Sequence, residues 1–181
     1  LKHSLIANKS FFKYLDKNIA NILKLKSPFI EKTIFESCKI KKKVVEKDEK
    51  EKNLRKILNF GHTFAHAYEA SLGFSKKLNH GEAVILGMNT ALKFSYKKKF
   101  LKKHEYNLVL NHIKNSKLPN SIKNYFSSTD VKKVISFMIK DKKNITKNIN
   151  LILLKKIGSP IINMVYKAEY LKIFLKNELK N

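Results

Sequence analysis

Cysteine, arginine and long apolar runs are scarce in this 181-residue sequence, and each scarcity excludes a class of protein. The single Cys38 excludes an internal disulfide framework and suits a reducing compartment. No apolar run approaches the roughly 18 residues that a membrane-spanning helix needs, so we expect no membrane association. No GxGxxG loop occurs either, so the chain lacks the usual glycine-rich cradle for a dinucleotide.

Acidic residues are also few, and 39 basic against 14 acidic residues give a formal net charge of +25. Such a charge is compatible with nucleic-acid binding. However, Arg55 is the only arginine, whereas base and phosphate recognition usually depends on the planar guanidinium fork. The lysines are spread along the whole chain, so we interpret the charge as a solvated surface and expect no nucleic-acid partner. A basic helical nucleic-acid-binding module is the non-enzyme alternative.

Hydrophobic residues make up 43% of the chain, enough for a packed core. We predict one mainly α-helical domain over residues 1–181, with a small β-hairpin near 150–165 around Gly158-Ser159-Pro160. Spacing and capping signals predict helices at about 1–22, 54–72, 80–96, 104–116, 130–140 and 168–179. A further helix should begin at Ser27-Pro28 and run to the charged stretch 46–52, which we interpret as solvated helix surface and not as a linker. Because the first pattern starts at Leu1 without a cap, we expect the chain to be truncated at its N-terminus.

The most informative segment is the predicted helix at 54–72. On an ideal helix, at about 100° per residue, its polar residues share an arc of roughly 80°. They are Arg55, Asn59, His62, His66 and Glu69. The rest of the circumference is apolar, which is typical of a buried helix, and five polar groups facing a dry core would be costly. We therefore predict that this stripe lines a polar pocket.

Three histidines mark this pocket as a metal or catalytic site. His62 and His66, four residues apart, can reach the same small site, as in helical metal motifs. No glutamate follows the first histidine, so the HExxH metalloprotease pattern is absent. His80 opens the next predicted helix, whose positive end favours a neutral imidazole that can bind a cation. Glu69 and Glu82 are expected to be structural or to orient these histidines.

Several segments follow one another in the order typical of a known family. They are Lys43-Val44-Val45, Asp48-Glu49, Glu51, Leu54-Arg55, Leu58-Asn59-Phe60-Gly61-His62-Thr63-Phe64, His66-Ala67, His80-Gly81-Glu82-Ala83-Val84 and Gly87-Met88. The match extends to 1–6 at one end and to 141–143 and 152–158 at the other. This series resembles the signature of the 3-dehydroquinate synthases. Ala65 stands where many members have glycine.

The resemblance implies the C-terminal domain of the dehydroquinate synthase-like fold, with an α/β NAD-binding domain upstream of it. It implies that His62 and His80 bind a divalent metal, zinc or alternatively cobalt, together with a glutamate two positions before Leu1. It implies His66, Arg55 and Asn59 as catalytic residues. The implied substrate-binding residues are Lys2, Lys41, Arg55, Asn59, His66 and Lys142, with Lys143 as the alternative to Lys142.

The family's substrate is an anionic seven-carbon sugar acid, 3-deoxy-arabino-heptulosonate 7-phosphate, and several cations suit its two anionic groups. The implied reaction releases phosphate and forms 3-dehydroquinate in the shikimate pathway, a carbon–oxygen lyase activity that depends on NAD and metal. The resemblance further implies a cytoplasmic homodimer at full length. Alone, the chain should be inactive. The enzyme alternatives are another sugar-phosphate cyclase and a metal-dependent polyol dehydrogenase.

Overall fold

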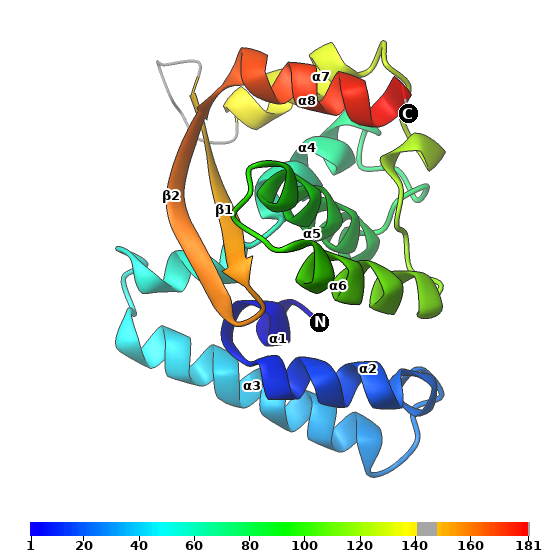
Figure 1. Ribbon diagram of the computed structural model, residues 1–181, viewed down its shortest axis with the longest axis vertical. Coiled ribbons are helices and arrows are strands. Elements are labelled where there is room, and N and C mark those ends of the chain that lie inside the picture. The colour runs from blue at the N-terminus through cyan, green and yellow to red at the C-terminus, as the bar shows by residue number, and fades with distance from the viewer. Residues whose placement is uncertain (141–147, 181) are drawn as a thin grey trace.

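The computed structural model describes residues 1–140 and 148–180, and the predicted Lys142 and Lys143 lie outside these ranges. Figure 1 shows a mainly helical chain with one β-hairpin, which confirms the predicted fold class. The elements are α1 (Lys2–Ala7), α2 (Lys9–Leu23), α3 (Phe29–Lys47), η1 (Leu54–Asn59), α4 (His62–Ser71), α5 (His80–Lys97), α6 (Lys103–Asn115), η2 (Ile122–Asn124), α7 (Val131–Lys140), β1 (Asn148–Lys156), β2 (Ser159–Lys167) and α8 (Ala168–Lys180).

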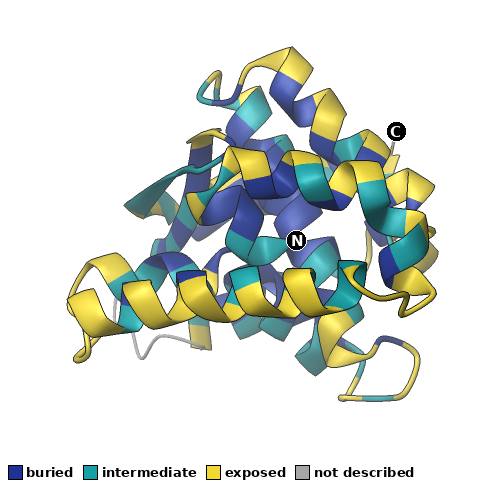
Figure 2. Ribbon diagram, turned by 90° about the horizontal axis from the view of Figure 1, so that it is seen from below, coloured by how far each residue is buried: buried dark blue, intermediate teal, exposed yellow. Residues whose placement is uncertain are grey.

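The core forms around α4 and α5. Helix α5 lies in the middle of the molecule, with α7 and α8 above it and the α2–α3 pair below (Figure 1). Helix α4 packs against α5 and α7, and the hydroxyls of Tyr68 and Thr90 join α4 to α5 across 2.9 Å. Phe60, Phe64 and Leu86 are fully buried. In Figure 2 the buried residues fill the interior, while the outward faces of the helices are exposed.

The hairpin ties the N-terminal helix to the core. Strands β1 and β2 pair antiparallel, and β1 buries Ile149, Leu151 and Leu153 as the alternation of a half-buried strand requires. At the turn, the N–H of Gly158 donates to the carbonyl of Leu5 across 2.7 Å. The N–H of Ile157 donates to a carboxylate oxygen of Glu105 on α6 across 2.6 Å. The turn thereby holds α1 beside the core.

The predicted single helix over 1–22 is wrong in one respect, because it is divided at Asn8. Asn8 has an extended backbone, with φ of −153° and ψ of 100°, and its side chain accepts the N–H of Phe11 across 2.9 Å. Asparagine is a strong N-cap residue because its side chain bonds an otherwise unpaired amide. The cap starts α2 in a new direction, and α1 becomes a separate short helix.

The predicted helix over 54–72 is also wrong, because it is divided at Gly61. Residues 54–59 form the 3₁₀ helix η1, and α4 starts only at His62. Gly61 has a φ of +82° in the left-handed region, which favours glycine. His62, His66 and Glu69 therefore share one face of α4, as predicted. Arg55 and Asn59 do not belong to this face, because they lie on η1.

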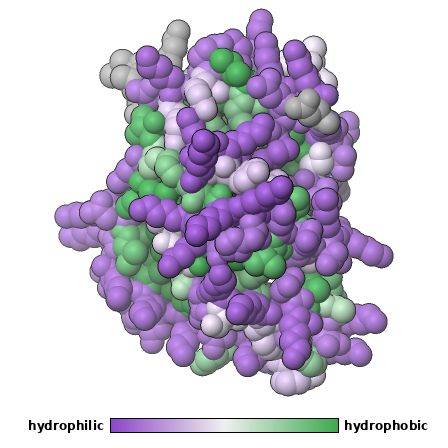
Figure 3. Space-filling model, in the orientation of Figure 1, coloured by the Kyte–Doolittle hydropathy of each residue, from purple (hydrophilic) through white to green (hydrophobic). Residues whose placement is uncertain are grey.

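Lysine side chains cover much of the surface, as the sequence predicted. The face in Figure 3 is mostly hydrophilic, with apolar patches between the charged groups. Within residues 1–140 and 148–180, no helix combines the length and apolar character needed to cross a bilayer.

We predict that Gly61→Ala lowers the thermal stability of the intact protein. A Cβ atom there would lie 2.6 Å from the backbone nitrogen of Met88 and 2.7 Å from its Cγ. The positive φ adds strain, so we expect a loss of about 2 kcal/mol or more in the free energy of unfolding. Calorimetric melting measures it.

Gly81→Ala is the matched control, because a Cβ atom at Gly81 has no neighbour within 4 Å. It should melt at or above the wild-type temperature, since alanine is the better helix former. Equal melting temperatures for Gly61→Ala and the wild type would contradict the close approach of Gly61 to α5.

Candidate metal and substrate site

Three histidines from two helices meet on one side of the α4–α5 pair. The ring centroids of His62 and His66 on α4 are 5.5 Å apart. The ring of His80, at the start of α5, lies 6.1 Å from that of His62 and 6.4 Å from that of His66. His62 and His66 are half-buried, whereas His80 is exposed. The structure thus groups the three histidines that the sequence singled out.

The tautomer of His62 follows from its two neighbours. Its Nδ1 lies 3.3 Å from the carbonyl oxygen of Phe60, a contact that a protonated Nδ1 donates. Its Nε2 lies 3.5 Å from the ammonium nitrogen of Lys2 on α1, and an ammonium group has no acceptor. Nε2 therefore carries the lone pair and accepts from Lys2.

His80 is oriented in the same way by a carboxylate. Its Nδ1 lies 3.0 and 3.2 Å from the two carboxylate oxygens of Glu69, which lies near the end of α4. Glu82, by contrast, accepts the N–H of Asn79 across 2.9 Å as part of a capping box. Of the two glutamates that the sequence left open, Glu69 thus orients a histidine and Glu82 starts α5.

Positive charge gathers beside His62. Burial and then the charge of Lys2 lower the pKa of His62 to about 4, so its imidazole is neutral at physiological pH. Burial and then the charge of Lys41 lower the pKa of Lys2. Burial and then Lys2 lower the pKa of His3 to about 4. Lys2, Lys41 and His3 therefore lie close together beside His62, and sequence reasoning had not included His3 among the site residues.

The histidine rings are about as far apart as imidazoles that share a metal ion. With a zinc–nitrogen bond of about 2.1 Å, two imidazoles on one ion have ring centroids about 5 to 6 Å apart. The rings of His62 and His66 are 5.5 Å apart and those of His62 and His80 are 6.1 Å apart, so the distances alone do not select the ligand pair. His62 and His80 both present Nε2, because Nδ1 is held by Phe60 or Glu69. Among the described residues, no three His, Cys, Asp or Glu side chains already surround one ion. The three histidines are the candidate ligands of such a site.

Arg55 and Asn59 belong to a neighbouring arrangement. The guanidinium Nη1 of Arg55 donates to the carbonyl of Glu49 across 2.6 Å, and Nδ2 of Asn59 donates to a carboxylate oxygen of Glu51 across 2.7 Å. Both residues are thus held by the loop between α3 and η1, and not by the histidines. Sequence reasoning missed this loop, although Asp48, an acceptor residue at a helix end, signals it.

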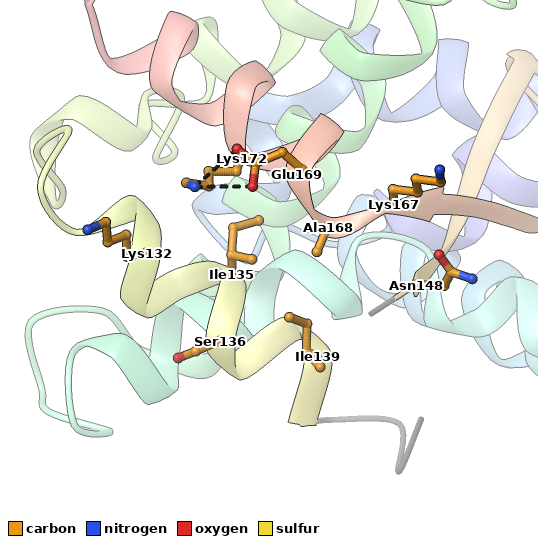
Figure 4. Close-up of a pocket in the computed structure, with 9 residues that line it drawn as sticks. All are labelled: Lys132, Ile135, Ser136, Ile139, Asn148, Lys167, Ala168, Glu169 and Lys172. Atoms are coloured by element: carbon orange, nitrogen blue, oxygen red, sulfur yellow. Dashed lines mark hydrogen bonds and ion pairs between the residues drawn. The ribbon is translucent and has the colours of Figure 1, made fainter. Parts of the chain in front are cut away.

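A separate cavity of about 530 Å³ lies between α7 and the start of α8 (Figure 4). Its wall includes Lys132, Ile135 and Lys167, and the ammonium group of Lys172 pairs with Glu169 across 3.0 Å. None of the predicted metal or substrate residues of the described chain lines it. The cavity does not belong to the histidine site.

Comparison with known proteins shows which family this chain is similar to. The family model that describes the 3-dehydroquinate synthase C-terminal region matches residues 1–144. The 3-dehydroquinate synthase of Pelagibacter ubique is 56% identical over 179 residues, which are 99% of this chain and 49% of that protein. The enzyme of Endomicrobium trichonymphae is 40% identical over 98% of this chain and 47% of its own length. The chain thus spans about half the length of these curated relatives.

Solved structures show the same fold at low sequence identity. A 2-epi-5-epi-valiolone synthase from Streptomyces hygroscopicus, solved with NAD+ and Zn2+, has a TM-score of 0.78 at 19% identity, over 98% of this chain and 49% of its own. A 2-deoxy-scyllo-inosose synthase, solved with carbaglucose-6-phosphate, NAD+ and Co2+, has a TM-score of 0.73 at 22% identity, over 97% and 49%.

We predict that His62 titrates with a pKa of about 4 in the metal-free intact protein, well below the usual 6.5. The unfolded chain takes up the proton first as the pH falls from 6.5 toward 4, so protonation of His62 lowers the free energy of unfolding in that window. NMR titration of the imidazole resonances measures the pKa, and His62→Gln identifies the signal. A value near 6.5 would contradict the packing of His62 beside Lys2.

Proposed function

Because the chain belongs to the 3-dehydroquinate synthase C-terminal family, we propose that it is the metal- and substrate-binding part of a 3-dehydroquinate synthase. The intact enzyme would convert 3-deoxy-arabino-heptulosonate 7-phosphate to 3-dehydroquinate and phosphate. The observation that carries the proposal is the pair of oriented imidazoles, His62 and His80, beside a cluster of cations. Since the chain spans about half of its relatives, we assign NAD binding to the other half.

His62 and His80 would hold the divalent metal, zinc first and cobalt as the alternative. A zinc ion bound by two histidines and a third protein ligand keeps one open position, where it makes a bound substrate hydroxyl more acidic. The neutral state of His62 supports this role, because only a neutral imidazole binds a cation. Glu69 keeps Nε2 of His80 available by holding its Nδ1.

Cationic side chains would hold the two anionic ends of the substrate. Lys2 lies at the histidine cluster, and Lys41 is close enough to lower the pKa of Lys2. A carboxylate or phosphate placed between them would relieve this repulsion, which favours binding of an anion. Arg55 can bind an oxyanion through two parallel hydrogen bonds, and Asn59 can hold a hydroxyl. Lys142 is the further candidate by family resemblance.

His66 is the proposed acid–base group. Its ring lies 5.5 Å from that of His62 and 6.4 Å from that of His80. A half-buried imidazole can accept a proton from one substrate oxygen and return it to another. Holding the flexible sugar acid in one position while its carbons are rearranged then depends on the surrounding cations.

The quaternary structure and location follow the family proposal. We propose a homodimer in the cytoplasm with a small anionic sugar phosphate as substrate and no nucleic-acid partner. The exposed, unpaired Cys38 fits a reducing compartment.

We predict that the intact protein binds about one zinc ion per subunit. His62→Ala or His80→Ala should abolish metal retention, because each removes one of few ligands. His66→Ala should keep the metal and lose turnover, because its imidazole is not a ligand. Metal content is measured by elemental analysis after gel filtration, and turnover by phosphate release. Full zinc occupancy in the double variant His62→Ala/His80→Ala would refute the ligand assignment.

We predict that Glu69→Gln weakens zinc binding about 10- to 100-fold, because it removes the carboxylate that orients His80. Competition with a fluorescent chelator measures the affinity. Glu82→Gln is the matched control, since Glu82 caps α5 and touches no metal ligand through its carboxylate. Equal affinities for the two variants would show that the contact of Glu69 with His80 does not support the metal site.

One assay separates the proposed function from the polyol dehydrogenase alternative. The proposed enzyme releases phosphate from the seven-carbon sugar acid phosphate without net formation of NADH, because the hydride is returned to the substrate. A polyol dehydrogenase accumulates NADH and releases no phosphate. Accumulation of NADH with glycerol, and no phosphate release with the sugar acid, would overturn the proposal.

A further inference from the structure

The loop between α3 and η1 is organised by a single carboxylate. Oδ1 of Asp48 accepts the N–H of Lys52 across 2.9 Å. Oδ2 accepts the N–H of Asn53 across 2.8 Å and that of Arg55 across 2.9 Å. The first amides of a helix have no intrahelical partner, and Asn53, at the N-cap of η1, makes no side-chain cap. Asp48 therefore caps η1 from a distance.

The backbone of this loop needs such support. Glu51 has a φ of +53°, a conformation that residues with a side chain rarely adopt. Strained positions of this kind persist when surrounding contacts determine them. The N–H of Glu51 donates to the carbonyl of Asp48 across 3.2 Å. The main chain of Asp48 thus holds Glu51 itself, and its side chain holds three amides that follow Glu51.

The same loop holds two of the proposed substrate-binding side chains. The carbonyl of Glu49 accepts Nη1 of Arg55 across 2.6 Å, and the carboxylate of Glu51 accepts Nδ2 of Asn59 across 2.7 Å. The position of Glu49 and Glu51 depends on the shape of the loop, and that shape depends on Asp48. A chain of contacts therefore runs from Asp48 to Arg55 and Asn59.

Asp48 keeps its charge in this setting. The hydrogen bond from the amide of Arg55, followed by that of Asn53, lowers the pKa of Asp48 below its ordinary value. Each amide contact is thus a charge-assisted hydrogen bond at neutral pH, which is stronger than a neutral one.

We infer that Asp48 is a positioning residue of the substrate site, which sets the orientation of Arg55 and Asn59 through the loop 48–53. It does not touch the substrate itself. This inference rests on the proposed function, since it assumes that Arg55 and Asn59 hold the sugar acid phosphate.

The test compares kcat/KM for phosphate release in the intact, metal-loaded protein. Asp48→Asn keeps the size of the side chain but loses the charge, and a neutral amide can accept at one oxygen only. We expect kcat/KM to fall about tenfold, while the metal content stays at the wild-type level. In an Arg55→Met background the further loss should shrink to about twofold, because Asp48 acts through Arg55. Asp48→Ser is the second variant, with a loss in the same direction.

Asp130→Asn is the matched control. Asp130 is also a carboxylate that accepts hydrogen bonds from a nearby turn, the N–H and hydroxyl of Ser127, both across 2.8 Å. It lies just before α7 and outside the proposed site, so its variant should retain wild-type kcat/KM. A loss in Asp48→Asn no greater than in Asp130→Asn overturns the inference, and so does a loss of undiminished size in the Arg55→Met background.

Failure of the proposed function is recognised separately, as a wild-type protein that releases no phosphate. Amide hydrogen exchange then tests the inference, because it measures the protection of the loop amides and does not require an active enzyme. Loss of protection at Lys52, Asn53 and Arg55 in Asp48→Asn, with the exchange near Asp130 unchanged, supports the positioning role. Unchanged protection at these three amides overturns it.

Discussion

The close approach of α4 and α5 at two glycines is the constraint on which the site depends. Gly61 lies against the backbone of Met88, and Gly87 lies against the carbonyl of Gly61 and the backbone of Ala65. A side chain at either glycine would push the helices apart. Because α4 carries His62 and α5 begins with His80, this spacing also fixes how far apart the two imidazoles are. The close packing of the core therefore also determines the separation of the two imidazoles.

The break at Gly61 serves the site in a second way. The chain leaves η1 at Phe60, whose carbonyl is turned toward Nδ1 of His62. A continuous α-helix would have used that carbonyl in its own hydrogen-bond ladder. The irregular backbone thus supplies the group that selects the tautomer of His62. Arg55 and Asn59, on the other side of the break, are directed by the loop that precedes η1.

Periodicity and caps were enough to predict most helices and the hairpin, because each buries an apolar face against the core. They failed at Asn8 and Gly61, where the apolar spacing continues across a change of direction. A period of 3.6 cannot register such a change, although asparagine and glycine were present as signals. The grouping of His62, His66 and His80 could be predicted from spacing and family resemblance. The contacts of Asp48 and His3 could not, because they depend on how a loop and a short helix fold back on the core.

The distribution of charge bears on how a very basic chain could hold the proposed metal ion. Its lysines repel a metal ion at long range, but salt screens exposed charges beyond about 10 Å. At the site itself the pKa of His62 is lowered, so its ring adds no positive charge of its own. Glu69 supplies one negative charge directly behind His80. The lysines near the site would then favour the proposed anionic substrate, and a bound anion would offset their repulsion toward the proposed metal ion. In this arrangement, metal and sugar acid phosphate would stabilise each other's binding, which follows from linkage between two sites that share one electrostatic field.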